Sequence, residues 1–125
     1  MKILATFFIG DNEPSDYKDR PTVKAIIVND NDEVLFFASG IPGGGVEVGE
    51  TNEEALNREL MEELGAQVSI DEELGSIVAY RDVLKLKYIF TFYNCTLISI
   101  GTPTTTIGHE IGKTFSWEKR SDAIN

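Results

Sequence analysis

Residues 44–66 of the chain read GGVEVGETNEEALNRELMEELGA, and no other stretch says as much about the protein. The stretch contains seven glutamates and one arginine, Arg58. Three of the glutamates, Glu59, Glu62 and Glu63, stand at helical spacing, so their side chains share one side of a helix. Carboxylate oxygens gathered in this way suit a hard divalent cation. The pattern therefore predicts a helix that presents acidic ligands.

The expected helix runs from Asn52 to Leu64 and has recognisable ends. Thr51 and Glu54 stand three residues apart, which is the pattern of a capping box. Gly65 is the residue type that most often ends a helix, because glycine readily adopts a left-handed backbone. Leucines at every fourth position form an apolar stripe roughly a right angle around the helix from the glutamates. The stripe consists of Leu56, Leu60 and Leu64.

The same stretch resembles the Nudix box, the signature of the Nudix hydrolases, written G-x5-E-x7-R-E-U-x-E-E-x-G-U with U a bulky aliphatic residue. The preceding Ile41-Pro42-Gly43 resembles the usual lead-in of that family, and Ala66 alone departs from the pattern, at the last U position. The box covers about a fifth of the chain. The residues that match in register are Gly44, Glu50, Arg58, Glu59, Leu60, Glu62, Glu63 and Gly65.

The resemblance implies the family's α/β/α sandwich around a mixed β-sheet, an α/β (α+β) fold, as a single domain over residues 1–125. Segments rich in β-branched and aromatic residues, which favour strands, outnumber helices along the chain. The run Asn29-Asp30-Asn31-Asp32 predicts a hairpin turn. A short strand ending near Trp117 and a second helix starting within Glu118–Asn125 complete the layout. The main expected strands are Ile3–Phe8, Thr22–Val28, Val34–Ala38, Ser76–Tyr80 and Leu84–Ile98.

The resemblance also implies a metal site. In the family, glutamates of the box bind one or more Mg²⁺ ions, which Mn²⁺ sometimes replaces, and a carbonyl of the glycine loop, here that of Gly43, adds a ligand. A later glutamate, for which Glu110 is the candidate, adds a ligand or acts as general base in many members; otherwise Glu110 is a surface loop residue. Without the box, the glutamate triad would more simply be a solvated acidic surface. The expected ligands from the helix are Glu59, Glu62 and Glu63.

Arg58 lies one turn before Glu62 and can hold a carboxylate with its fork of donors. Glu50, in the preceding loop, is its expected partner. A plain ion pair between Arg58 and Glu62 is the simpler interpretation, and both can hold together. Glu47 faces the same region, either as a supporting group or as an ordinary surface charge. Glycines let the loop approach a ligand closely; they are Gly43, Gly44, Gly45 and Gly49.

The chemistry that the box implies is attack of water on a phosphorus of a diphosphate bond, assisted by the metal. Glu59 or Glu62 would accept the proton of the water, and Arg58 and Glu50 complete the expected catalytic set. We expect a Mg²⁺-dependent pyrophosphohydrolase that cleaves a nucleoside diphosphate linked to another moiety, most simply a MutT-like nucleoside triphosphate pyrophosphatase. An ADP-ribose or nucleotide-sugar pyrophosphatase is the alternative, and a non-catalytic nucleotide sensor or interaction module is the alternative of another class.

Residues for the nucleoside are harder to recognise. Tyr80, Tyr88, Phe90, Phe92 and Trp117 could stack on a base, although aromatic residues of strands usually belong to the core. Tyr88, Phe90 and Phe92 alternate along one expected strand and so face the same side. The sequence alone leaves the substrate open.

Composition narrows the class of protein. A net charge of −10 over 125 residues disfavours a general binder of polymeric nucleic acid and fits a small nucleotide as partner, for a monomer or homodimer. No apolar run approaches the ~18 residues of a membrane span. Acidic residues follow Met1–Gly10 at once, which argues for a strand there rather than a signal peptide, and for a cytoplasmic protein. Cys95 is the only cysteine, so it excludes an intramolecular disulfide and a thiolate-rich zinc site and is expected in the core.

Overall fold

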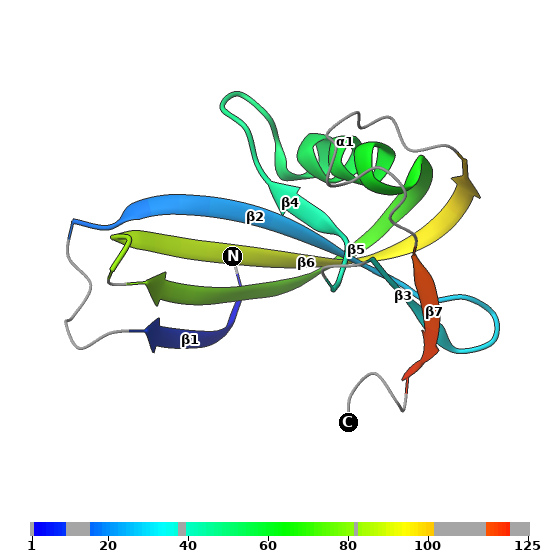
Figure 1. Ribbon diagram of the computed structural model, residues 1–125, viewed down its shortest axis with the longest axis horizontal. Helices are drawn as coiled ribbons and strands as arrows, with labels where there is room; N and C mark the ends of the chain where they lie inside the picture. The colour runs from blue at the N-terminus through cyan, green and yellow to red at the C-terminus, as the bar shows by residue number, and fades with distance from the viewer. Residues whose placement is uncertain (1, 10–15, 38–39, 82, 102–114, 121–125) are drawn as a thin grey trace.

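A computed structural model describes residues 2–9, 16–37, 40–81, 83–101 and 115–120. These residues form a five-stranded sheet of order β1-β5-β6-β2-β4, a two-stranded sheet and one helix (Figure 1). The large sheet consists of β1 (Ile3–Ile9), β2 (Lys18–Ile27), β4 (Gly43–Gly45), β5 (Ala66–Arg81) and β6 (Leu86–Ile100). The small sheet pairs β3 (Glu33–Phe36) with β7 (Ser116–Lys119), and helix α1 spans Asn52–Leu64.

The large sheet is mixed, as expected. β5 and β6 form a long antiparallel ladder, and β1 and β2 join it in parallel, β1 beside β5 and β2 beside β6. β4 closes the far edge antiparallel to β2. Helix α1 contacts β2, β4 and β5 and covers one face of the sheet (Figure 1). A second helical layer, which the sandwich would have, has no element within the described residues.

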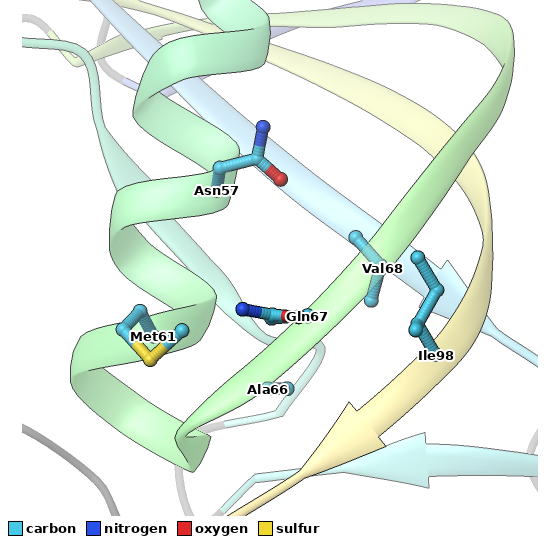
Figure 2. Close-up of a pocket in the computed structure, with 6 residues that line it drawn as sticks. All are labelled: Asn57, Met61, Ala66, Gln67, Val68 and Ile98. Carbon is cyan, nitrogen blue, oxygen red and sulfur yellow. The ribbon is translucent and has the colours of Figure 1, made fainter.

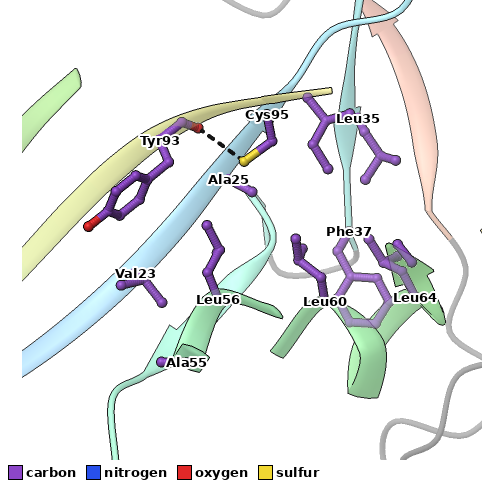
Figure 3. Packing of buried hydrophobic residues seen from close by; sticks show 12 residues of the cluster. Val23, Ala25, Leu35, Phe37, Ala55, Leu56, Leu60, Leu64, Tyr93 and Cys95 are labelled. Atoms are coloured by element: carbon purple, nitrogen blue, oxygen red, sulfur yellow. Dashed lines mark hydrogen bonds between the residues drawn. The ribbon is translucent and has the colours of Figure 1, made fainter. Parts of the chain in front are cut away.

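The core lies between α1 and the sheet face that it covers. Leu56, Leu60 and Leu64 are almost completely buried, which confirms the apolar stripe. They pack with inward-facing residues of β2, β3 and β6 (Figure 3). Cys95 is also part of this core, as predicted, and desolvation by burial raises the pKa of its thiol to about 12. The helix is therefore fixed in rotation by apolar packing along its whole length.

The glycine run before the helix is a strand as well as a turn. Gly43, Gly44 and Gly45 pair with Lys24, Val23 and Thr22 of β2, where the sequence suggested only a loop. Gly43 has a φ of 146°, and a Cβ at this position would collide with the carbonyl of Val23. Only glycine therefore allows β4 to lie so close to β2.

Other expected elements lie where the sequence predicts them, but some differ in length. The turn at Asn29–Asp32 is confirmed, because the side-chain oxygen of Asn29 accepts from the backbone N–H groups of Asn31 at 2.9 Å and Glu33 at 3.0 Å. β5 starts at Ala66, ten positions before the expected Ser76. Its first half, AQVSIDEEL, is too polar to suggest a strand, yet the pairing with β6 satisfies its backbone. The ladder overrides local propensity there.

The C-terminal part of the chain is described over residues 115–120. Ser116–Lys119 form β7, which includes Glu118, where a helix was expected to begin, and Arg120 has helical backbone. Residues 121–125, which hold the rest of the expected second helix, lie outside the described residues. In the part of the chain that is described, no helix combines the length and apolar content needed to cross a membrane.

Candidate active site

Short-range hydrogen bonds fix both ends of α1. The hydroxyl of Thr51 accepts from the N–H of Glu54 at 3.1 Å, and the carboxylate of Glu54 accepts from the N–H of Thr51 at 2.9 Å, which confirms the capping box. At the other end Gly65 has a left-handed φ of 63°, and its N–H donates to the carbonyl of Met61 at 3.0 Å. With its leucines buried and its ends capped, α1 turns its carboxylate side toward the glycine run.

Arg58 joins the helix to the loop that precedes it. Its Nε donates to Oε2 of Glu50 at 2.7 Å and its Nη2 donates to Oε1 of the same carboxylate at 2.9 Å, a bidentate pair. Nη2 also donates to the carbonyl of Gly45 at 2.9 Å. The expected pairing of Arg58 with Glu50 is therefore present. Through it, one guanidinium holds residues from β4, the loop and the helix in a single network.

The remaining nitrogen of Arg58 faces the carboxylates of its own helix. Nη1 donates to Oε1 of Glu59 at 2.9 Å and lies 3.4 and 3.5 Å from the two oxygens of Glu62. The ion pair with Glu62 thus exists beside the pair with Glu50. Glu47 stands 3.9 Å from Nη1 with its side chain mostly exposed, so it adds little to this network.

Glu63 and Glu59 contact the glycine run directly. The N–H of Gly43 donates to Oε1 of Glu63 at 3.0 Å. A Cβ on Gly44 would lie 2.5 and 2.6 Å from the two carboxylate oxygens of Glu59, closer than van der Waals contact permits. Gly44 therefore leaves the space into which the carboxylate of Glu59 fits. The glycines of the box shape the site as well as bending the chain.

The network keeps its charges at neutral pH. Hydrogen bonds from Arg58, followed by one from the backbone N–H of Glu47, lower the pKa of Glu50 from the ordinary value of 4.5 to about 2. The bond to Glu50, opposed by partial burial and helped by Glu59, raises the pKa of Arg58 above its usual range. Arg58 and Glu50 thus form a permanent ion pair behind the helix glutamates.

The glutamates of α1 have oxygen atoms that can bind a metal, but their side chains do not converge on one point. Among the described residues, no three His, Cys, Asp or Glu side chains converge as a ready-made metal site. Glu59 and Glu62 are turned toward Arg58, and Glu63 toward the N–H of Gly43. The donors are nevertheless all carboxylate oxygens, which suit a hard divalent cation. The space at Gly44 that admits the Glu59 carboxylate supports the same fit.

The structure brings together most of the residues singled out from the sequence. Glu50, Glu59 and Glu62 contact Arg58, and Gly43 bonds Glu63 separately, whereas Glu110 lies outside the described residues. Sequence reasoning missed the bond from Gly43 to Glu63, because residues twenty positions apart meet there only through the pairing of β4 with β2. It also missed Lys24, whose ammonium group donates to the carbonyl of Ile41 at 3.2 Å and so supports the start of the glycine run.

Two cavities flank this region. One, of about 300 Å³, adjoins the start of the glycine run at Ile41. Its lining is mostly apolar, with one amide and one cation, and consists of Ile26, Val28, Val34, Phe36, Ile41, Asn94 and Arg120. The other, of about 320 Å³, lies between α1 and the paired strands β5 and β6 (Figure 2). It is lined by Asn57, Met61, Ala66, Gln67, Val68 and Ile98, none of which belongs to the Arg58 network.

A family model described as the NUDIX domain matches residues 18–123 of the chain, which includes α1, the glycine run and all of the large sheet except β1. The chain belongs to the NUDIX family. The resemblance read from the box is thereby confirmed, and the mixed sheet with its single described helix is a NUDIX fold.

Individual NUDIX proteins resemble the chain in sequence or in fold. An RNA pyrophosphohydrolase of Acinetobacter baylyi is 48% identical over 52 residues, and the match covers 37% of this chain and 31% of that protein. The chain thus spans about a third of the length of that curated relative. The structure of the DNA mismatch repair protein MutT from methicillin-resistant Staphylococcus aureus 252 is 27% identical, has a TM-score of 0.61 and covers 87% of either chain. A NUDIX hydrolase from Nitrosomonas europaea shares the fold, with a TM-score of 0.67 at 22% identity over 84% of this chain and 75% of that chain.

The family and these relatives set the general class of the protein. They make hydrolysis of a phosphorus-containing acid anhydride the activity to propose. NUDIX hydrolases generally use divalent metals and act on small nucleotides.

Proposed function

We propose that the protein is a Mg²⁺-dependent pyrophosphohydrolase that hydrolyses the diphosphate bond of a nucleoside diphosphate linked to another moiety, with nucleoside triphosphates as its substrates. The observation that carries the proposal is the Arg58 network. One guanidinium contacts Glu50 from the loop and Glu59 and Glu62 from the helix, beside the Gly43–Glu63 bond. An arrangement of this kind prepares carboxylates for a metal and a phosphate chain, which plain surface charges would not need.

Glu59 and Glu63 would hold the cation, together with the carbonyl of Gly43, and Glu62 would stand beside them. When bound, a divalent cation polarises the phosphoryl oxygens and acidifies the attacking water. Arg58 orients Glu59 and Glu62, while its own charge is paired most closely with Glu50. The residues of the chain thus supply negative charge at fixed positions. The positive charge of the metal would balance the negative charge of the substrate's phosphates.

Glu62 is the better proton acceptor of the two candidates. Its side chain is 42% exposed and its contacts with Arg58 are long, at 3.4 and 3.5 Å. Glu59 is 17% exposed and lies 2.9 Å from Arg58, confined by Gly44. A side chain that accepts a proton from water must be accessible to water and must not be bound in a tight ion pair. We assign that role to Glu62 and a ligand role to Glu59.

Hydrolysis forms one bond at phosphorus and breaks another. A water oxygen forms a bond to phosphorus while its proton passes to Glu62, and the bond from that phosphorus to the bridging oxygen breaks. The bridging oxygen leaves on the departing phosphate with the bonding electrons. From a nucleoside triphosphate the products are the nucleoside monophosphate and pyrophosphate.

The cavity at Ile41 supports a nucleoside at one end of the substrate. It is mostly apolar and of the size of a small ligand site, and the carboxamide of Asn94 offers it both a donor and an acceptor. Ile41 precedes Pro42 and Gly43 directly, so the cavity adjoins the backbone that would contact the phosphates. Two of the aromatic residues that could stack on a base, Tyr88 and Phe90 of β6, stack on each other instead, with ring centroids 5.6 Å apart.

The experiment is a Mg²⁺-dependent hydrolysis panel with identification of the products. It includes nucleoside triphosphates, oxidised nucleotides, ADP-ribose and other nucleotide sugars, dinucleoside polyphosphates, and a triphosphate-ended RNA oligonucleotide suggested by the relative from Acinetobacter baylyi. Nucleoside monophosphate and pyrophosphate from triphosphates support the proposal. If only nucleotide sugars are hydrolysed, they are the substrates in place of nucleoside triphosphates. Tight binding of these compounds without hydrolysis of any of them would identify a sensor instead of an enzyme.

A further inference from the structure

The edge strand β1 has no described strand on its outer side. β1 pairs with β5 along its inner edge, and in the described residues nothing continues the sheet beyond it (Figure 1). An edge of this kind presents backbone N–H and C=O groups that can pair with another chain. Proteins usually protect such edges with charged residues or prolines, or keep them very short. The seven residues of β1, ILATFFI, contain no charged residue and no proline.

β1 also carries an unusual amount of exposed apolar surface. Ile3, Leu4, Phe7 and Phe8 are 54%, 49%, 55% and 57% exposed, so four large apolar side chains stand half in solvent on one short strand. Phe8 stacks on Tyr80 of β5 at 5.1 Å, which leaves its outer side uncovered. Apolar surface gathered in this way marks an interaction site more often than chance exposure.

The position of β1 is built into the fold. The N–H of Ser76 donates to the carbonyl of Lys2 at 2.7 Å, and the parallel ladder with β5 continues to the end of β1. Gly75 has a φ of 138°, and a Cβ there would lie 2.8 Å from Cγ of Leu4. The absence of a side chain at Gly75 thus makes room for β1. The exposed edge is a permanent part of the sheet and not a loosely attached segment.

The charge of the edge permits a second copy of this chain as the occupant. A protein of net charge −10 repels its own copies, so a contact between two copies needs a surface without acidic groups. Residues 1–10, MKILATFFIG, contain no acidic residue and one base, Lys2. β1 therefore offers two copies an edge strand without acidic side chains of its own.

We propose that two copies of the protein associate through antiparallel pairing of β1 with β1 about a two-fold axis at Thr6, which makes one continuous ten-stranded sheet. With that centre, Phe7 of one copy lies opposite Ala5 of the other, and Phe8 lies opposite Leu4. Directly opposed residues of antiparallel strands point to the same face, so each phenylalanine meets a side chain smaller than itself. A two-fold contact of this kind closes on itself and does not form fibres.

The contact is a weak and reversible one. Half of the surface of four apolar side chains amounts to roughly 300–400 Å² in each copy, which with the paired backbone gives roughly 800–1,000 Å² in total. This area belongs to the class of transient complexes, so the dimer is expected to dissociate readily on dilution. β1 lies at the opposite edge of the sheet from β4, so pairing leaves the Arg58 network open.

Sedimentation velocity from about 1 to about 300 µM tests the association, because mass action makes a dimer concentration-dependent. We expect a monomer at the low end and a dimer at the high end. The variant Phe7→Lys should raise the dissociation constant by about tenfold or more, because it places a charge on the edge. The matched control Ile98→Lys adds the same charge at a side chain of β6 that is also more than half exposed, and it should shift the dissociation constant by less than about twofold. A wild-type protein that stays monomeric throughout, or a dimer that Phe7→Lys leaves intact, would overturn the proposal.

A cysteine placed on the axis tests the register. In Thr6→Cys the two introduced residues lie directly opposite each other, about 4.5–5.5 Å apart between Cα atoms, which a disulfide can span. Cys95 is buried and does not compete. Mild oxidation should give a disulfide-linked dimer several times faster than in Ser99→Cys, an exposed control position on β6. Equal rates in the two variants would contradict the pairing.

Hydrogen exchange of the wild-type protein gives a measurement that needs no variant to fold. The backbone amides of residues 3–9 should become more protected as protein concentration rises, and those of residues 43–45, at the other edge, should not. Added salt should strengthen the dimer, because screening reduces the repulsion between two acidic copies. Concentration-dependent protection at β4 with none at β1 would assign association to the other edge and exclude this one.

Discussion

The two sides of α1 use the same thirteen residues for opposite purposes. On one side Leu56 and Leu60 have no solvent exposure and hold the helix on the sheet. On the other side Arg58 gathers Glu50, Glu59 and Glu62 at a partly exposed surface, where like charges would repel one another without it. Stability and chemistry are thus separated by about a quarter turn of one helix. Substitutions on the two sides should therefore change different measurements.

The largest effect is expected from removing a charge on the carboxylate side. Glu62→Gln or Glu63→Gln should lower turnover roughly 10²- to 10⁴-fold, through loss of a proton acceptor or a metal ligand. The melting temperature should hardly change, because the amide keeps a carbonyl oxygen as hydrogen-bond acceptor. Steady-state kinetics at saturating Mg²⁺ and thermal unfolding measure the two. Glu53→Gln, on the first turn of the same helix, is the control, and wild-type turnover in both site variants would exclude the assignment.

The converse substitution is Leu60→Ala on the leucine side. Removing a fully buried leucine should lower the free energy of unfolding by about 3 kcal/mol, through lost burial and the cavity left behind. Turnover per folded molecule should remain within a few-fold of wild type, since the Arg58 network is not touched. Denaturant unfolding and kinetics at low temperature provide the measurements. A loss of turnover comparable with that of Glu62→Gln would show that the two sides are coupled.

A smaller effect on stability is expected at the start of the helix. Thr51→Ala removes the hydroxyl that accepts from the N–H of Glu54 and should cost about 1 kcal/mol in the free energy of unfolding. Thr51→Ser keeps that oxygen and should cost only a fraction of this. Denaturant unfolding of both variants checks the difference. Equal losses in the two would mean that the methyl group of Thr51, and not its hydroxyl, stabilises the helix.

The smallest effect is a pH dependence at Glu50. The folded protein lowers the pKa of this carboxyl from 4.5 to about 2, so the stabilisation it contributes is complete above pH 4.5 and is lost as pH falls toward 2. The difference in melting temperature between wild type and Glu50→Gln should accordingly shrink between about pH 5 and about pH 2.5. Glu72→Gln, at an exposed position of β5, controls for the general loss of a negative charge. A constant difference over this range would contradict the ion pair with Arg58.

The helix was predictable to the residue, and the reason is local. Thr51, Glu54 and Gly65 act on backbone groups within one turn of themselves, and the leucine stripe needs only a sheet to cover it. β5 was half missed, because its polar first half forms a strand only through its long ladder with β6. The sequence of the glycine run indicates a loop, because glycine has low strand propensity and β4 depends on pairing with β2.

The contacts of the site also fall into two groups, those that the sequence predicts and those that depend on tertiary structure. Spacing along the chain was enough to indicate that Arg58 bonds Glu50 and Glu62 and that the glutamates share a side of the helix. Spacing said nothing of the Gly43–Glu63 bond, of the space at Gly44 that Glu59 occupies, or of the cavity beside Ile41. Those contacts join β4, β2 and α1, which are separate in sequence.

By itself, the sequence determined the family, the limits of α1 and the residues that meet within one or two helical turns, because helix geometry converts spacing directly into position. Tertiary structure alone decided how the glycine run lies against Glu59 and Glu63, and that β1, an ordinary apolar strand on paper, stands at an open edge. The physical reason is that strand pairing brings together residues far apart in the chain. Neither propensity nor spacing specifies which strand stands beside which.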